Sequence, residues 1–236
     1  CPRLSPREKH PKLMVDKTDM KWELHTLRIH QIWLGSPIPP HLERMTETWQ
    51  EFHPGAEYIL WRDEDIADLE LQNRKLYDRA DKLVRPDAVY QYKADVARYE
   101  ILHQFGGVYA DTDTTCQRNL EGTLAGDNMV VGWEVQGKWI GNTVIYAPEQ
   151  HRGLKAIIAS LPRFARNGGR SASKLSGPQA ITSLLRTRQD VTVLDQGKFY
   201  PVPYSEPERS TDSHPSAYVV HHWQHQRDAR GIGYNG

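Results

Sequence analysis

Two aspartates that stand one residue apart, Asp111 and Asp113, indicate chemistry by their type and spacing. They follow two glycines and the apolar residues 108–110 in the stretch GGVYADTDTT. Side chains at i and i+2 of an extended strand point to the same side, so we expect both carboxylates to converge on one ion and Thr112 to point away. Without a counter-charge, such a pair resists burial. Few hard oxygen ligands suit Mg²⁺ or Mn²⁺ that keeps water and bridges phosphates, so a diphosphate is the expected counterpart.

A second charged pair precedes the aspartates. Asp95 and Arg98 lie three positions apart, and therefore on one face, of the helix expected over residues 87–105. One interpretation is a surface ion pair worth at most roughly 1 kcal/mol. The other is that Arg98 reaches the same site as the aspartates and hydrogen-bonds a polyol or a phosphate. The spacing alone leaves both open.

The elements that must position these residues alternate between strand and helix. Apolar runs predict strands at 27–35, 56–61, 108–110, 128–134 and 143–147, followed by VTVLD and AYVVHHW. Helical spacing predicts helices at 41–52, 87–105, 151–165 and 177–189, and a short helix capped by Asp63. This βαβ opening predicts an α/β fold, in which open sheets bind ligands at the carboxyl ends of their strands. The aspartates stand at such an end.

The bulk composition excludes several classes of protein. The 236 residues suit one domain, and 30 Lys and Arg balance 30 Asp and Glu, so no basic field favours nucleic acid. Two cysteines are too few for a disulfide framework, which favours a reducing compartment. No apolar run approaches the roughly 18 residues of a membrane span. We expect a cytoplasmic chain without an integral membrane segment, although a first residue other than Met leaves an upstream anchor open.

The stretch KADVARYEILHQFGGVYADTD (93–113), with IHQIWLG (29–35), resembles a family of sugar transferases. This is the DXD-motif family, glycosyltransferase family 32-like, which includes yeast-type α-1,6-mannosyltransferases, lactosylceramide-type α-1,4-galactosyltransferases and bacterial capsule enzymes involved in polysaccharide biosynthesis. The chain has every residue of the pattern Ser/Ala-Asp-x-x-Arg-Tyr-x-x-Leu-x-x-x-Gly-Gly-x-Tyr-x-Asp-x-Asp. The glucosylating domains of large clostridial toxins are more distantly similar.

The resemblance implies a fold, a donor and a cofactor. It implies a GT-A domain over residues 27–236, Rossmann-like, with a central mixed sheet and added helices, and leaves residues 1–26 as an N-terminal arm. It also implies a nucleotide-sugar donor (a UDP- or GDP-hexose), Mn²⁺ or Mg²⁺, and retention of the anomeric configuration by same-face attack. The acceptor hydroxyl can belong to a glycan, a glycolipid or a protein. The sequence identifies no dedicated general base.

Roles in this family carry over to matching positions. Asp95 and Arg98 correspond to the residues that hold donor-sugar hydroxyls. Asp111 corresponds to the acid that contacts ribose or sugar and the ion's water, and Asp113 to the acid that binds the ion. Trp33 matches an aromatic that packs against the nucleobase, although a core tryptophan is an equally good interpretation.

The carboxyl-terminal part of the chain adds donor-binding candidates. Asn142 aligns with an asparagine near the sugar, and residues 176–178 resemble the family's Thr/Ser-Gly-Pro helix start. In AYVVHHWQ, His221 and Trp223 share one face of a strand, and this His-x-Trp resembles the family's closing motif. Because a neutral imidazole joins carboxylates on Mn²⁺ more readily than on Mg²⁺, His221 is the candidate third metal ligand. The following QHQRDARG departs from the family's Ser-Trp.

Two rival functions follow from the same residues. VYADTDTT also fits a haloacid-dehalogenase-like phosphatase, in which Asp111 would be the phosphorylated nucleophile and Asp113 the acid and base. Against this, the phosphatase motif belongs on an early strand, and no second acid accompanies Asp127. The other rival is a non-catalytic module that binds a sugar nucleotide.

Overall fold

A seven-stranded sheet forms the centre of the molecule, which the computed structural model describes over residues 26–124, 126–167 and 169–233. The strand order is β2-β1-β3-β7-β5-β6, and β8 also pairs with β5. β1, β2 and β3 are parallel, β7 is antiparallel to β3 and β5, and β8 is parallel to β5. The predicted α/β class with a mixed sheet is confirmed. The strands are β1 Arg28–Ile32, β2 Glu57–Trp61, β3 Gly107–Ala110, β5 Met129–Val135, β6 Trp139–Ile140, β7 Val144–Ala147 and β8 Val191–Leu194.

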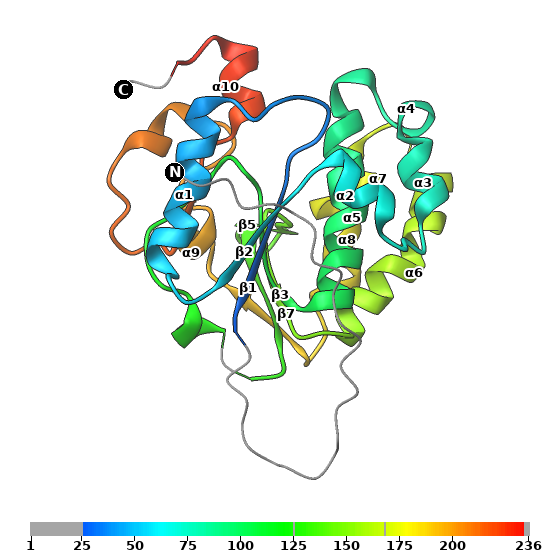
Figure 1. The fold of residues 1–236 in the computed structure, drawn as a ribbon, viewed down its shortest axis with the longest axis horizontal. Helices are drawn as coiled ribbons and strands as arrows, with labels where there is room; N and C mark the ends of the chain where they lie inside the picture. Colours follow the sequence, from blue (N-terminus) through cyan, green and yellow to red (C-terminus); the bar gives the residue numbers. More distant parts are fainter. Residues whose placement is uncertain (1–25, 125, 168, 234–236) are drawn as a thin grey trace.

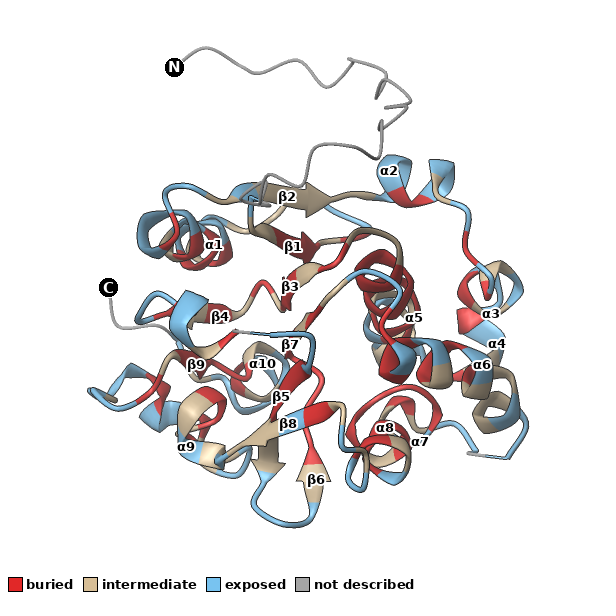
Figure 2. Ribbon diagram, turned by 90° about the horizontal axis from the view of Figure 1, so that it is seen from below, coloured by how far each residue is buried: buried red, intermediate tan, exposed pale blue. Residues whose placement is uncertain are grey.

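Helices cover both faces of this sheet (Figure 1, Figure 2). One side carries α3 Arg74–Asp78, α4 Ala80–Leu83, α5 Val89–Phe105, α6 Arg152–Asn167, α7 Ala172–Leu175 and α8 Pro178–Leu185. The other side carries α1 Pro40–Phe52, α9 Gln196–Phe199, α10 Gln224–Arg230 and a small antiparallel sheet of β4 Thr114–Cys116 and β9 Val219–His221. α2 Asp63–Asp68 follows β2, and 3₁₀ turns occupy Pro86–Ala88, Glu121–Thr123 and Pro207–Thr211.

Two hydrophobic clusters fill the space on the two sides of the sheet. β3 contributes Tyr109 to the cluster that includes residues of α5 and α6. It contributes Val108 and Ala110 to the cluster that includes Trp49 and Tyr200. This alternation is typical of a strand buried on both faces, so both helical layers fix the direction of β3.

Two glycines turn the chain from α5 into β3. Gly106 follows the helix with φ +61°, and Gly107 begins the strand with φ +98°. A Cβ atom at Gly107 would lie 2.4 Å from the carbonyl oxygen of Arg28. Only glycine suits this combination of positive φ and close backbone approach, which sets β3 against β1.

Several predicted boundaries differ from the structure. Asp63 does not cap α2: the helix begins at this residue, and its carboxylate accepts a hydrogen bond from Gly35 N (2.7 Å). Asp65 instead accepts the Arg62 N–H (2.8 Å). The predicted helix over 177–189 ends at Leu185, and the arm over 1–26 lies outside the described residues except for its last position.

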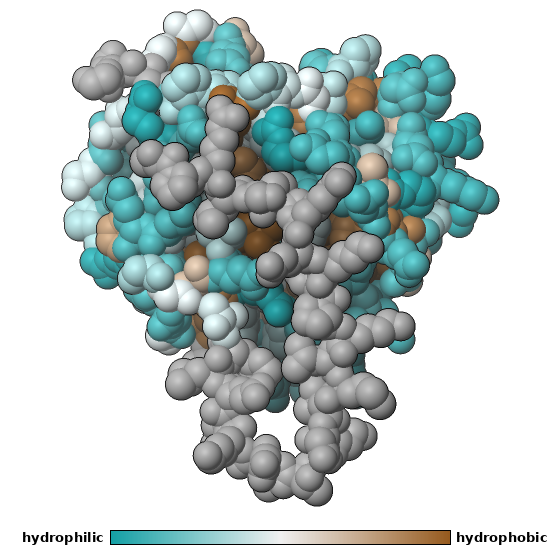
Figure 3. All heavy atoms as spheres, viewed as in Figure 1, coloured by the Kyte–Doolittle hydropathy of each residue, from teal (hydrophilic) through white to brown (hydrophobic). Residues whose placement is uncertain are grey.

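The surface seen in Figure 3 is mainly hydrophilic, with apolar residues near its middle. β2 is an edge strand on this side, and its last four residues are only half-buried. Within the described residues, no helix combines the length and the apolar character that crossing a bilayer requires.

Candidate active site

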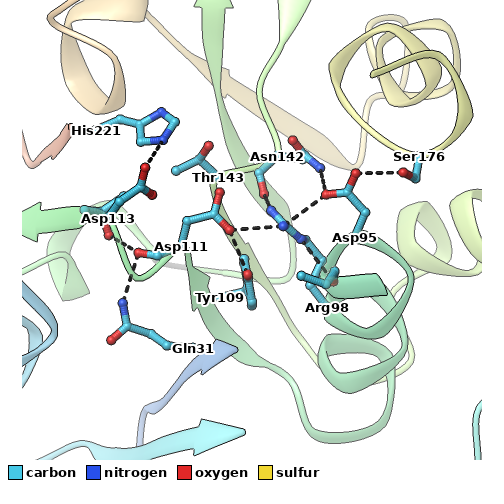
Figure 4. A network of polar contacts seen from close by, with 12 residues as sticks. Gln31, Asp95, Arg98, Tyr109, Asp111, Asp113, Asn142, Thr143, Ser176 and His221 are labelled. Atoms are coloured by element: carbon cyan, nitrogen blue, oxygen red, sulfur yellow. Dashed lines mark hydrogen bonds and ion pairs between the residues drawn. The ribbon is translucent and has the colours of Figure 1, made fainter. Parts of the chain in front are cut away.

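Asp111, Asp113 and His221 lie together where β3 ends, and Figure 4 shows them side by side. One potential ligand atom from each residue lies within 4.8 Å of those from the other two. His221 is the last residue of β9, which pairs with β4 immediately after the aspartates. Strand pairing therefore brings together residues 108 positions apart in the sequence.

The aspartates converge for a different reason from the one predicted. They lie in a turn between β3 and β4, not in an extended strand, so alternation does not align them. The Asp111 carbonyl accepts hydrogen bonds from Gln31 Nε2 (3.1 Å) and Thr114 Oγ1 (2.6 Å). The Asp113 carbonyl accepts one from His222 N (2.9 Å). Thr112, expected to point away, is buried. Backbone contacts on both sides hold the turn.

Asp113 and His221 interact electrostatically, and the donor atoms of this group suit a divalent cation. Burial opposes the charge of Asp113, but His221 (3.2 Å) and the Gln224 N–H (2.9 Å) outweigh it and lower its pKa to about 2. Burial also lowers the pKa of His221, but Asp113 outweighs this and leaves it raised. His221 Nδ1 is buried and has no hydrogen-bond partner among the described residues. Two carboxylates and an imidazole form a donor set suited to Mn²⁺, and the unpaired nitrogen is consistent with a further ligand.

Asp95 and Arg98 form a buried ion pair beside this group. Arg98 Nη2 lies 3.0 Å from Asp95 Oδ1, and both side chains are at most 3% exposed. The surface interpretation is therefore wrong. The same nitrogen lies 3.0 Å from Asp111 Oδ1, and Nη1 donates to the Asn142 carbonyl (2.6 Å). Arg98 thus connects α5, the aspartate turn and the start of β7.

Asp95 is held on its other sides as well. Its carboxylate accepts hydrogen bonds from Asn142 Nδ2 (2.8 Å) and Ser176 Oγ (2.7 Å). Burial raises the pKa of Asp95, and Arg98 and Ser176 oppose that rise. The sequence candidates Asn142 and Ser176 therefore belong to one network with the ion pair (Figure 4).

Trp33 and Trp223, the two tryptophans among the sequence candidates, have different surroundings. Trp33 follows β1, is half-buried, and its Nε1 has no hydrogen-bond partner among the described residues. The Trp223 ring lies 4.0 Å from that of His221, and its Nε1 donates to the Val202 carbonyl (3.0 Å). The Trp223 ring therefore packs against the ring of His221, the candidate metal ligand.

Two tyrosines at the site were not identified from the sequence. Tyr109 donates its hydroxyl proton to Asp111 Oδ1 (2.7 Å), and the Arg98 guanidinium lies 4.4 Å from the centre of its ring. Tyr200 accepts the Thr143 N–H (3.1 Å) and meets the His221 ring edge-on. The tyrosine of the Gly-Gly-x-Tyr motif was a signal for Tyr109, whereas Tyr200 lies in no such pattern.

The site and the fold define the class of the protein. Residues 39–130 match the family described as the glycosyltransferase sugar-binding region containing a DXD motif, so this segment is similar to that family. The PaToxG glycosyltransferase has a similar fold, with a TM-score of 0.55 at 16% identity over 67% of this chain and 68% of that chain. The predicted sugar-transferase resemblance and GT-A fold are confirmed.

Curated relatives support the same class. The chain is 33% identical over 142 residues to inositol phosphoceramide mannosyltransferase 3 of Schizosaccharomyces pombe, covering 59% of this chain and 38% of that protein. It is 26% identical over 151 residues to the lactosylceramide 4-alpha-galactosyltransferase of Mus musculus, covering 55% and 40%. The chain thus spans about two fifths of the length of these relatives.

Proposed function

We propose that this chain transfers a hexose from a UDP- or GDP-sugar to an acceptor hydroxyl, with a divalent cation and with retention of configuration. One observation carries the proposal: the candidate cation ligands Asp111, Asp113 and His221 adjoin the buried Asp95–Arg98 network. The first group suits a diphosphate through its cation, and the second offers hydrogen-bonding groups to a sugar. The domain responsible is residues 27–236.

Asp113 and His221 would hold the cation directly, with Asp111 beside them. When bound, the cation supplies positive charge that stabilises the departing nucleoside diphosphate. The imidazole favours Mn²⁺ over Mg²⁺. Arg98 and Tyr109 fix one Asp111 oxygen, which leaves the other available, and Asp111 is a quarter exposed.

The buried network would place the donor sugar. Asp95 is only 1% exposed and already has three partners, so its first role is to orient Arg98 and Asn142. A carboxylate has about four acceptor sites, which leaves one for a sugar hydroxyl. Trp33, at the end of β1, would stack on the nucleobase, and Trp223 would support His221 on the donor side.

The acceptor is proposed as a hydroxyl of a glycan, a glycolipid or a protein. The names of the two relatives specify a mannosyltransferase for inositol phosphoceramide and a galactosyltransferase for lactosylceramide. Both are sphingolipids, which favours a glycolipid as the first acceptor class to test.

A thermal-shift panel tests the donor and the cation. UDP-, GDP- and dTDP-sugars are added with and without Mn²⁺, because a ligand that binds only the native state raises the melting temperature. We expect one nucleotide class to stabilise the protein only with Mn²⁺, and Asp113→Asn to abolish that shift. Asp127→Asn, at an exposed site, is the matched control.

Turnover separates this proposal from its rivals. Mn²⁺-dependent release of the nucleoside diphosphate, with a product of the donor's anomeric configuration by NMR, would support it. Binding without turnover would indicate a non-catalytic module. Release of inorganic phosphate from generic phosphoesters would indicate the phosphatase.

A further inference from the structure

Glu134, near the carboxyl end of β5, is a carboxyl group that neither the sequence motif nor the buried network includes. β7 is antiparallel to both β3 and β5, so β3 and β5 end at the same edge of the sheet. β5 pairs with β6 at Trp133 and Val135, with a shift of register between these two residues.

Alternation along β5 places Glu134 on the Tyr200 side of the sheet. Met129 and Val131 belong to the hydrophobic cluster that includes residues of α5 and α6, and Trp133 packs against that cluster. Val130 belongs to the cluster that includes Tyr200. A Cβ atom at Gly132 would lie 3.0 Å from the Phe199 ring. Alternation from positions 130 and 132 puts Glu134 on the Phe199 side of the sheet, and the effect of its charge on the pKa of Tyr200 agrees with this placement.

This side of the sheet leads to the candidate metal ligands. The Tyr200 ring lies 6.1 Å from that of His221, and its hydroxyl accepts the N–H of Thr143, next to Asn142. The charge of Glu134 acts on Tyr200 and His221, and those of Asp111 and Asp95 act on Glu134. Glu134 therefore faces the site from the side opposite α5.

The Glu134 carboxylate differs from the other carboxylates of the site in its hydrogen bonding. Asp95 contacts Arg98, Asn142 and Ser176. Arg98 and Tyr109 contact one oxygen of Asp111, and His221 and Gln224 N contact one oxygen of Asp113. Within the described residues, the half-buried Glu134 carboxylate has no hydrogen-bond partner. Burial raises its pKa to about 7; His221 opposes the rise, and Asp111 and Asp95 add to it.

We propose that Glu134 binds the attacking hydroxyl of the acceptor and accepts its proton. This inference rests on the proposed glycosyl transfer. The hydroxyl oxygen forms the new bond to the anomeric carbon, and its proton passes to Glu134. The bond from that carbon to the diphosphate oxygen breaks, and its electron pair leaves with the diphosphate. A proton acceptor with a pKa near the working pH suits this step.

Donor hydrolysis, with water as the attacking hydroxyl, provides the test. Release of UDP from UDP-glucose and of GDP from GDP-mannose is measured with Mn²⁺ for the wild type, Glu134→Gln and Glu134→Asp. Glu121→Gln, at an exposed site, is the matched control. We expect Glu134→Gln to lower kcat about 10²- to 10⁴-fold. Its Mn²⁺-dependent thermal shift with UDP or GDP should equal that of the wild type.

Two further readouts distinguish proton transfer from a structural role. The kcat of the wild type should decrease as the pH falls below about 7, and the kcat of Glu134→Gln should not show this dependence. Glu134→Asp should recover part of the turnover because it keeps a carboxylate. If Glu134→Gln does not fold, Glu134→Ala with added formate decides, and turnover should rise with formate concentration.

The outcomes separate the two proposals. The role of Glu134 is overturned if turnover of Glu134→Gln lies within about threefold of the wild type. Where Glu134→Ala decides, turnover that does not depend on formate overturns it. Either result leaves the transferase proposal standing. A wild type without any shift or turnover with either donor overturns the proposed function, and this inference with it.

Discussion

The buried pair of Asp95 and Arg98 gives a prediction whose size follows from the geometry. Replacing Arg98 with Met removes the contacts to Asp95, Asp111 and the Asn142 carbonyl together. Breaking a buried pair from one side costs about 3–5 kcal/mol, because a charge is left uncompensated. In a domain of this size, 1 kcal/mol corresponds to about 2–4 °C, so we expect the melting temperature to fall by about 6–20 °C.

The cost of Arg98→Met should depend on pH. Burial already raises the pKa of Asp95, and loss of Arg98 removes its nearest positive charge. The folded variant then binds more protons than its unfolded state, so its stability increases as the pH falls. The deficit relative to the wild type should therefore shrink between pH 7 and pH 5.

Urea unfolding followed by tryptophan fluorescence, with EDTA present, measures this cost. The control is Arg85→Met, because Arg85 pairs with Asp87 at 2.8 Å where both side chains are largely exposed (70% and 44%). Such a pair is worth about 0–1 kcal/mol. Adding Asp95→Asn to Arg98→Met should recover about 1–3 kcal/mol, because a neutral amide needs no counter-charge. Equal costs for Arg98→Met and Arg85→Met would refute the reasoning.

Three further substitutions test the frame and the donor site. Gly107→Ala should lower the free energy of unfolding in urea by at least about 2 kcal/mol, because φ is positive there and a carbonyl oxygen lies 2.4 Å from the new Cβ. Gly197→Ala is the control, because its new Cβ meets nothing within 4 Å and should leave stability unchanged. His30 accepts the Trp61 Nε1–H at Nδ1 (3.2 Å), and burial lowers its pKa from 6.5 to about 4. The neutral form of His30 contributes its full stability above pH 6.5. Acidification to pH 4 should therefore lower the free energy of unfolding of the wild type by about 3 kcal/mol more than that of His30→Gln. Equal acid sensitivity of the two proteins would contradict this. Trp33→Ala should weaken nucleotide binding by about 1–3 kcal/mol in calorimetry, and an unchanged Kd would place this ring in the core only.

The sequence predicted the parts of the structure that depend on local patterns. Apolar runs located β1, β2, β3, β5 and β7, and the Gly-Gly step located the end of α5. The charged residues of the motif located the site, because α5 and β3 follow each other directly in the sequence. Asp95, Arg98 and Asp111 meet across a single turn of the chain.

The remaining site residues depend on contacts that no local pattern encodes. Tyr200 reaches the site through a packing contact of its ring with Gly141, and Glu134, the proposed proton acceptor, lies on β5 outside the motif. α7 and α9 are four-residue helices, too short for a periodic signal. The prediction that Asp111 and Asp113 converge is correct, but the geometry assumed for it is wrong. We expected alternation along an extended strand, whereas the two residues lie in a turn.

The two halves of the site differ in how they are held, and Asp113 joins them. The Arg98 half is fixed by buried contacts among α5, β7 and the aspartate turn. The other half, residues 221–224, is attached to that turn through Asp113: its carboxylate binds His221 and Gln224 N, and its carbonyl binds His222 N. A cation at Asp113 and His221 would therefore neutralise a phosphate and also fix the start of α10 on the sheet. An Asp113 variant loses both effects, so its loss of activity does not measure the contribution of the metal alone. Removal of Mn²⁺ from the wild type does, because the contacts of Asp113 with His221 and Gln224 N stay available.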